Sequence, residues 1–156
     1  MKRFKNLLLF LCIVLGIFCC TPEGCYEDIE SDLVISLNES DEETQSIIDS
    51  LTVYGLGMES DSLYKNASTE NLFLPLFAGS DYSTFVVVNG QTKDTISINY
   101  NSTYNFVSKG CGYNFLYTIE SVTFTKNRID TILIINNNVS PDDEENLRTF
   151  FQSDNF

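Results

Sequence analysis

The sequence predicts an all-β protein, an antiparallel β-sandwich of about eight or nine strands with an immunoglobulin-like or transthyretin-like layout. Three observations predict it. Beyond residue 31, apolar and polar residues alternate with the period of two that is typical of half-buried strands. Short clusters of glycine, asparagine, aspartate and serine interrupt these runs. After the N-terminal 19 residues, no long segment has the 3.6-residue period of an amphipathic helix.

The first half of this region contains four predicted strands. Leu33, Ile35 and Leu37 alternate with less apolar residues in the first of them. Pro75 removes a hydrogen-bond donor from the fourth, which therefore belongs at a sheet edge or a bulge. The predicted strands are 32–38, 47–56, 62–65 and 71–77, with loops at 39–45, 57–61 and 66–70.

The second half of this region begins with the strongest local indication of a β-hairpin. Asn89-Gly90 is a pair preferred in two-residue hairpin turns, because both residues tolerate positive φ. The glycines of Gly110-Cys111-Gly112 indicate a bulge or a tight bend. Predicted strands lie at 82–88 and 91–100 around the hairpin turn, and then at 103–109, 113–120, 121–125 and 129–135. The last of these is the most apolar, so we expect it in the centre of a sheet.

The C-terminal tail allows two interpretations. Ser140 and Pro141, followed by four acidic residues, resemble the start of a helix. Residues 147–152 alternate as a strand does. We favour an acidic turn followed by a last strand.

The N-terminus resembles an export signal. A basic start precedes an apolar run, Leu7 to Phe18, which is shorter than the ~20 residues of a membrane-spanning helix. Cys19 and Cys20 end this run and resemble the lipobox of bacterial lipoproteins, where cleavage precedes an acylated cysteine. Cys20 fits better, because cleavage there leaves Cys19, rather than bulky Phe18, at the preceding small-residue position. The alternative is an ordinary secretory signal. The expected organisation is a lipoprotein signal peptide at 1–19, an acidic tether at 20–31 and one β-sandwich domain at 32–156.

The composition excludes several functions. The chain has nine basic and 22 acidic residues, and three of the basic ones lie in the signal segment. Such a charge repels nucleic acid and anionic lipid headgroups, so membrane attachment is expected through the N-terminal lipid alone. Histidine is absent from the sequence, which excludes a Ser-His-Asp triad and a histidine-bearing zinc site. We therefore predict no catalytic residue, no metal site and no cofactor.

Two cysteines remain once the signal is removed and Cys20 is acylated. In an oxidising compartment, Cys25 and Cys111 are expected to form a disulfide. The alternative is a pair of buried free thiols. The stretch Phe106 to Tyr113 then serves as a clamp that holds the tether against the middle of the sandwich.

The stretch around Cys111 also carries a family resemblance. Val107-Ser108-x-x-Cys111-Gly112-Tyr113, together with the lipobox and Leu74-Pro75-Leu76, resembles a family of uncharacterised Bacteroidota lipoproteins, classed as a domain of unknown function. Gly110 stands where that family often has alanine, and a histidine near the last strand is missing here. The resemblance implies a location in the bacterial cell envelope, at the outer membrane, and an outer-membrane β-barrel protein as a partner. It implies no activity.

The same lineage suggests O-glycosylation at triplets of Asp, then Ser or Thr, then an apolar residue. The alternative is that an acid in a turn followed by Thr-Ile simply begins a strand. The four candidate acceptors are Ser50, Ser62, Thr95 and Thr131.

Two functions are consistent with these features. The first is a non-enzymatic, lipid-anchored cell-envelope protein that acts in protein–protein interaction or as an accessory to an outer-membrane machine. The second is a glycan- or small-ligand-binding β-sandwich module, which the eight tyrosines and twelve phenylalanines favour. That second function predicts a row of exposed tyrosines on one sheet face.

Overall fold

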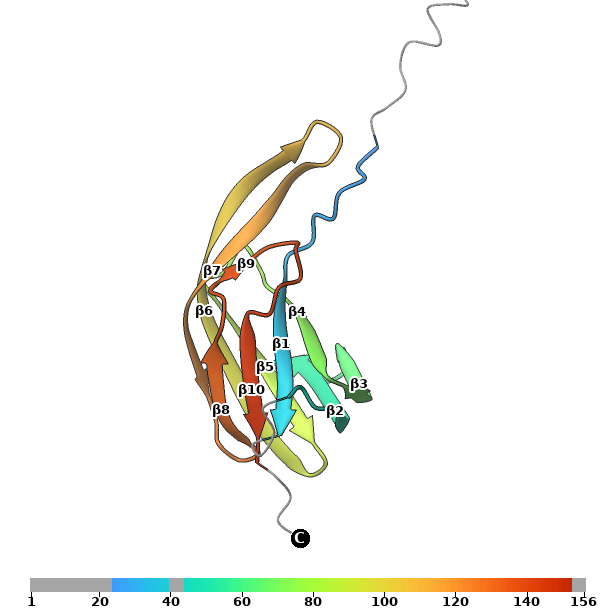
Figure 1. Cartoon of the computed structure of the whole chain (residues 1–156), viewed down its shortest axis with the longest axis vertical. Helices are drawn as coiled ribbons and strands as arrows, with labels where there is room; N and C mark the ends of the chain where they lie inside the picture. Colours follow the sequence, from blue (N-terminus) through green and yellow to red (C-terminus); the bar gives the residue numbers. More distant parts are fainter. Residues whose placement is uncertain (1–23, 40–43, 153–156) are drawn as a thin grey trace, which may run out of the picture.

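The computed structural model describes residues 24–39 and 44–152. In these residues the chain forms two β-sheets that pack face to face as a sandwich, and it contains no helix (Figure 1). The predicted all-β sandwich is therefore confirmed, whereas its immunoglobulin-like or transthyretin-like layout stays a prediction. The predicted signal peptide, residues 1–19, and the predicted acylation site, Cys20, lie outside the described residues. The strands are β1 Asp32–Glu39, β2 Ile48–Gly55, β3 Tyr64–Thr69, β4 Asn71–Pro75, β5 Tyr82–Asn89, β6 Thr92–Ser108, β7 Gly112–Phe124, β8 Ile129–Ile134, β9 Asn138–Val139 and β10 Leu147–Phe151.

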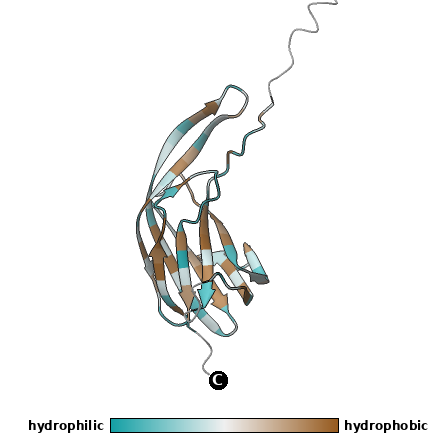
Figure 2. Cartoon of the chain, viewed as in Figure 1, coloured by the Kyte–Doolittle hydropathy of each residue, from teal (hydrophilic) through white to brown (hydrophobic). Residues whose placement is uncertain are grey.

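The core lies between a four-stranded sheet, β4-β1-β10-β8, and a six-stranded sheet, β3-β2-β5-β6-β7-β9. Alternate residues of each strand point inward, so Leu33, Ile35 and Leu37 of β1 are fully buried against Ile96 and Ile98 of β6 and their neighbours. Each such side chain contributes about 1.5–3 kcal/mol by leaving water. Hydrophobic residues recur along the strands of both sheets and continue up the long β6–β7 hairpin (Figure 2).

The centre of the four-stranded sheet differs from the prediction. The apolar strand β8 lies at an edge, and Leu133 and Ile134 remain nearly half exposed. The central positions belong to β1 and β10, which pair in parallel with Ile35 opposite Leu147. Apolar content predicted the wrong strand for the centre of the sheet. The strand β1 is buried on both faces, yet its outward positions include the polar residues Ser36 and Asn38. The predicted last strand and the edge position of β4 are confirmed.

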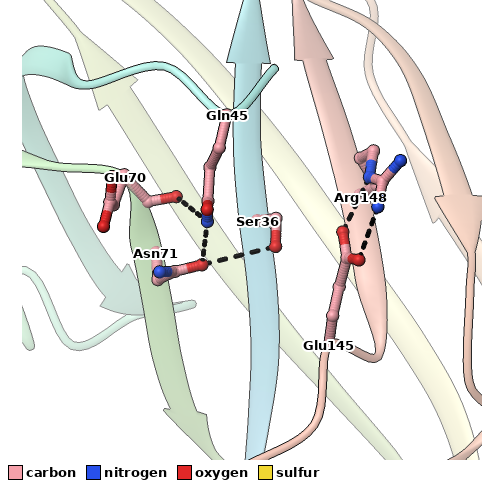
Figure 3. A network of polar contacts seen from close by, with 6 residues as sticks. All are labelled: Ser36, Gln45, Glu70, Asn71, Glu145 and Arg148. Carbon is pink, nitrogen blue, oxygen red and sulfur yellow. Dashed lines mark hydrogen bonds and ion pairs between the residues drawn. The ribbon is translucent and has the colours of Figure 1, made fainter. Parts of the chain in front are cut away.

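Polar contacts surround Ser36, one of the buried outward residues of β1. Ser36 Oγ donates to Asn71 Oδ1, which also accepts from Gln45 Nε2 (Figure 3). On the neighbouring β10, Arg148 makes a two-point ion pair with Glu145, with N···O distances of 2.7 and 2.6 Å (Figure 3). These contacts satisfy groups whose burial would otherwise cost free energy.

Asn146 joins β1 to the C-terminal strands. Its Oδ1 accepts from Val34 N at 3.0 Å, and its Nδ2 donates to the carbonyl of Asn138 at 2.7 Å. Asn146 N donates in turn to the carbonyl of Val34 at 2.9 Å. The buried amide therefore joins β1 to the loop that precedes β10 and to β9.

Two local predictions need correction. The β5–β6 hairpin forms, but Asn89 pairs with Thr92, so the turn residues are Gly90 and Gln91 rather than Asn89-Gly90. Gly90 alone of the two has positive φ, 61°, which suits a turn with glycine at its first central position. The polar segment predicted as the loop 66–70 instead belongs largely to β3. Asn66 adopts φ 48° there, and the irregular register of the β2–β3 pair accommodates it at the sheet edge.

Candidate functional site

The strand β6 continues far past the point where the sequence predicted a break. Its pairing with β5 ends at Asn99, yet β6 runs on to Ser108 and pairs with β7 alone. The residues 101–116, which we call the hairpin arm, project beyond the sandwich (Figure 1). A bulge between Asn99 and Tyr100 marks the place where the arm leaves the sheet.

The arm ends in the tight bend that its glycines predicted. Ser108 pairs with Gly112, so Lys109, Gly110 and Cys111 form the turn. Gly112 has φ 77°, a conformation that glycine adopts without strain. Ser108 Oγ accepts a hydrogen bond from Cys111 N at 3.1 Å, which closes the turn.

The predicted disulfide is confirmed. Cys25 and Cys111 are bonded, with their Cα atoms 4.5 Å apart and a sequence separation of 86. The predicted location of the clamp is wrong, however. Cys111 lies at the tip of the arm rather than at the middle of the sandwich, because β6 and β7 extend past the sheet before they turn. The disulfide therefore joins the described part of the tether, residues 24–31, to the arm tip.

Four aromatic side chains form two pairs across the arm, one tilted and one edge-to-face. Tyr104 lies opposite Phe115 with ring centroids 4.7 Å apart, and Phe106 lies opposite Tyr113 at 5.2 Å. Alternation places all four on one face of the arm. Tyr104, Phe106 and Tyr113 are 77%, 56% and 65% exposed. These aromatic pairs could have been predicted from the sequence, because two aromatic residues spaced two apart precede the bend and two more follow it.

The aromatic face continues into the core at the base of the arm. Tyr117 follows Tyr113 and Phe115 on the same face, is buried, and packs edge-on against Tyr100 at 5.4 Å. The Tyr117 hydroxyl donates to the carbonyl of Leu76 at 2.9 Å. Burial raises the pKa of Tyr117, and nearby Tyr100 and Asp32 raise it further. The base of the arm is thus fixed to the sandwich while its outer part stays open.

A cleft of about 410 Å³ lies between the arm and the tether. Tyr113, Phe115 and Tyr117 line one side, and residues 29–32 line the other. Pro75 and Leu76, at the end of β4, also line it. The cleft is therefore bounded by the disulfide-linked tether, the arm and the sandwich.

Acidic residues concentrate at the tether side of this cleft. Glu30 and Asp32 line it directly. Burial raises the pKa of Asp32, and the carboxylates of Glu30, Asp143 and Asp28 raise it further. The cleft therefore combines aromatic surface with negative potential, which favours a cationic or polar–aromatic occupant over an anion.

The four candidate glycosylation acceptors lie apart from the arm and differ in accessibility. Ser50 is exposed in a bulge of β2 with φ 56°. The other three are partly buried. Ser62 Oγ donates to the carbonyl of Glu59, and Thr131 Oγ1 donates to Asp130. The structure brings none of the four together.

Thr95 follows an aspartate that has a structural role. Asp94 is buried, and its carboxylate accepts hydrogen bonds from Thr125 Oγ1 and from the backbone of Asn127, Arg128 and Ile129. Burial by itself raises the pKa of Asp94, but these hydrogen bonds outweigh it and lower the pKa below the ordinary value. Asp94 thereby fixes the β7–β8 turn, a role that sequence reasoning missed.

Two further findings concern the described residues 24–39 and 44–152. No three cysteine or acidic side chains among them converge as metal ligands. No helix in this part of the chain is long and apolar enough to cross a membrane.

The fold and site together define a β-sandwich protein with a projecting hairpin that a disulfide clamps to the N-terminal segment. The chain belongs to DUF6452, a family of unknown function, whose model matches residues 50–151. That range starts in β2 and includes Cys111 and the whole arm, but it does not include Cys25. No curated protein and no solved structure shows detectable similarity to the chain.

Proposed function

We propose that the protein is a non-enzymatic Bacteroidota lipoprotein of the cell envelope, held in the outer membrane by acyl chains on Cys20, and that the hairpin arm is its contact surface for another protein. The observation that carries the proposal is the exposed aromatic face of the arm. Tyr104, Phe106 and Tyr113 form a contiguous apolar surface on an element that packs against little else. Clustered exposed aromatics are typical of protein-binding sites.

The position of the disulfide supports a role close to the membrane. Cys20 and Cys25 are five residues apart, and five extended residues span about 17 Å. Because Cys25 is bonded to Cys111, with their Cα atoms 4.5 Å apart, acylation of Cys20 would keep the arm tip within about 22 Å of the acylated residue. A partner embedded in the same membrane is then within reach, as expected of an outer-membrane β-barrel protein and its accessory lipoprotein.

Site-specific photocrosslinking in intact cells tests this proposal. A photoreactive phenylalanine analogue replaces Tyr104 on the arm, and the matched control replaces Tyr82 on β5, which is 60% exposed and lies outside the arm. We expect a reproducible crosslinked partner from position 104 and none from position 82. Mass spectrometry of the adduct then shows whether the partner is a β-barrel protein. The same set of adducts from both positions, or no adduct from position 104, contradicts the proposal.

The cleft favours a second candidate function, the binding of a glycan or small ligand. Tyr113, Phe115 and Tyr117 line a volume of about 410 Å³, a size that suits a small molecule, and sugars stack on aromatic faces. This candidate predicts saturable binding of a neutral oligosaccharide that Phe115→Ala abolishes. Glycan binding that survives this substitution eliminates the cleft as the site.

A further inference from the structure

The edge of β7 that faces the cleft has unpaired backbone groups. The pairing of β7 with β9 covers Tyr117 and Thr118 only. From Gly112 to Leu116, β6 on the opposite side is the only strand in the described part of the chain that pairs with β7. An unpaired strand edge readily accepts another strand.

The tether runs beside this edge without pairing to it. It is joined to the arm tip through Cys25 and reaches the sandwich at Asp32, where β1 begins (Figure 1). Within the described residues, Glu30 N donates only to the side chain of Asp28, and the buried Ser31 Oγ has no partner. The cleft is thus a slot between two chain segments whose facing polar groups are available for hydrogen bonding.

The negative charge of the cleft favours a positively charged occupant. Glu30 and Asp32 line it, and Asp28 and Asp143 lie close enough to Asp32 to influence its ionisation. Lys109, in the turn, is the only basic residue of the arm. The aromatic rings of Tyr113 and Phe115 add surfaces that attract cations.

Resting on the proposed function of the arm as a protein-binding surface, we propose that the cleft binds an extended, positively charged segment of the partner protein, which pairs as an added strand with Gly112–Leu116 of β7. Backbone pairing supplies affinity in such complexes, and alternate side chains supply specificity. Lysine or arginine side chains of the segment lie against Asp32, Glu30 and the aromatic rings. The disulfide keeps the slot preorganised, which reduces the entropic cost of binding.

Three synthetic nonapeptides test this inference against the purified, lipidated full-length mature protein in neutral detergent. The first alternates lysine and valine; the second replaces each lysine with glutamate; the third keeps the lysines but carries N-methyl groups on alternate backbone amides. Fluorescence anisotropy measures binding at low and at physiological salt. We expect saturable binding of the lysine peptide and at least roughly tenfold weaker binding of the other two. Absence of binding by the lysine peptide, equal binding of the glutamate peptide, or equal binding of the N-methylated peptide overturns the inference.

Two pairs of variants locate the binding site. Asp32→Asn is expected to weaken binding of the lysine peptide by about two- to fivefold, whereas Asp130→Asn on β8, outside the cleft, leaves it unchanged. Tyr113→Ala is expected to weaken binding by about two- to fivefold, and Tyr82→Ala, with similar exposure, to have no effect. Equal effects within either pair place binding outside the cleft and overturn the inference.

The crosslinking experiment separates this inference from the proposed function. A partner captured through Tyr104 without lysine-peptide binding overturns the strand-addition inference and leaves the proposed function intact. If the lysine peptide binds in the cleft but no partner is captured in cells, the preference of the cleft for an extended cationic segment is supported and the proposed function is contradicted.

Discussion

The Asp94 carboxylate lies 2.6 Å from the Thr125 hydroxyl and joins the start of β6 to the loop between β7 and β8. It also accepts from three successive backbone amides, those of Asn127, Arg128 and Ile129. One buried charge therefore satisfies the polar groups of an entire turn, because a carboxylate offers about four acceptor positions.

Asp94→Asn is expected to lower the free energy of unfolding at neutral pH by about 2–3 kcal/mol, because the amide replaces a charged acceptor and directs a donor at other donors. Chemical denaturation measures this loss. Asp130→Asn, at an exposed position on β8, is the control and should change stability by less than about 0.5 kcal/mol. Equal stability of Asp94→Asn and the wild type would contradict the structural role.

The depressed pKa of Asp94 gives this contribution a pH dependence. A carboxylate whose pKa is lower in the folded state stabilises the protein above its unfolded pKa, near 3.8, and the effect is lost as the pH falls through the folded pKa. The difference between wild type and Asp94→Asn should therefore shrink as the pH falls below 3.8. A difference that stays constant down to the acid-unfolding limit argues against the assignment.

Asp32 is expected to behave in the opposite way. Burial and the nearby carboxylates raise its pKa, so the folded state favours the protonated form and loses stability as the pH rises from the unfolded value, 3.8, through the folded pKa. Asp32→Asn should therefore raise the melting temperature at neutral pH, and the gain should vanish below pH 3.8. Asp61→Asn, in an exposed turn, is the control. A lower melting temperature for Asp32→Asn at neutral pH would contradict this reasoning.

Asp32→Asn also distinguishes folding from binding. The same substitution is expected to stabilise the fold and to weaken binding of the lysine peptide. A general structural defect cannot produce both effects, because it lowers stability and binding together.

Cys111→Ser is expected to lower the free energy of unfolding by ~4–5 kcal/mol in the chain-entropy model, since the bond closes a loop of 86 residues. Hydrogen exchange should accelerate in the sandwich core as well as in the tether and the arm, because core amides exchange through global unfolding. Cys25→Ser and the double variant are the controls, and all three should be equally stable because each lacks the same bond. A free thiol at either position in the unreduced mature protein would refute the assignment.

Cys20→Ser is expected to abolish incorporation of a labelled fatty-acid precursor, whereas Cys19→Ser should retain it. Metabolic labelling followed by immunoprecipitation measures both. Labelling that persists in Cys20→Ser and disappears in Cys19→Ser would move the cleavage site by one residue.

Glycosylation, if the triplets are used, is expected first at Ser50. Its side chain is exposed in a bulge of β2 beside the edge strand β3. Thr95 is partly buried and follows Asp94, whose carboxylate is hydrogen-bonded to Thr125. Intact-mass analysis of envelope-derived protein should show a glycan mass that Ser50→Ala removes and Thr95→Val leaves in place. The reverse pattern would show that accessibility does not select the site.

Much of the fold could be predicted from local patterns. The alternation in β1 and β2 indicated which side chains face the core, and Asn89-Gly90 located the hairpin to within one residue. Cys25 and Cys111 could be paired because the expected acylation of Cys20 leaves them together in an oxidising compartment. These inferences depend on steric and chemical properties of a few neighbouring residues, or on counting cysteines.

The sheet partners could not be predicted in the same way. A period of two shows which face of a strand is buried, but any strand can form the same backbone hydrogen bonds with any other. The parallel pairing of β1 with β10 joins residues more than a hundred positions apart, such as Ile35 and Leu147. For this reason the apolar strand β8 was predicted at the centre of a sheet, whereas it lies at an edge in the structure.

The sequence by itself determined the all-β class, most of the strands and the pairing of Cys25 with Cys111. Only the tertiary structure decided that β6 and β7 extend beyond the sandwich, that Cys111 lies at their tip, and that a cleft opens beneath them. The physical reason is that neighbouring residues specify a strand or a turn, but not which distant segments lie beside it. The pairing of β5 with β6 ends at Asn99, and the tether runs along β7, because of how distant segments pack around one core.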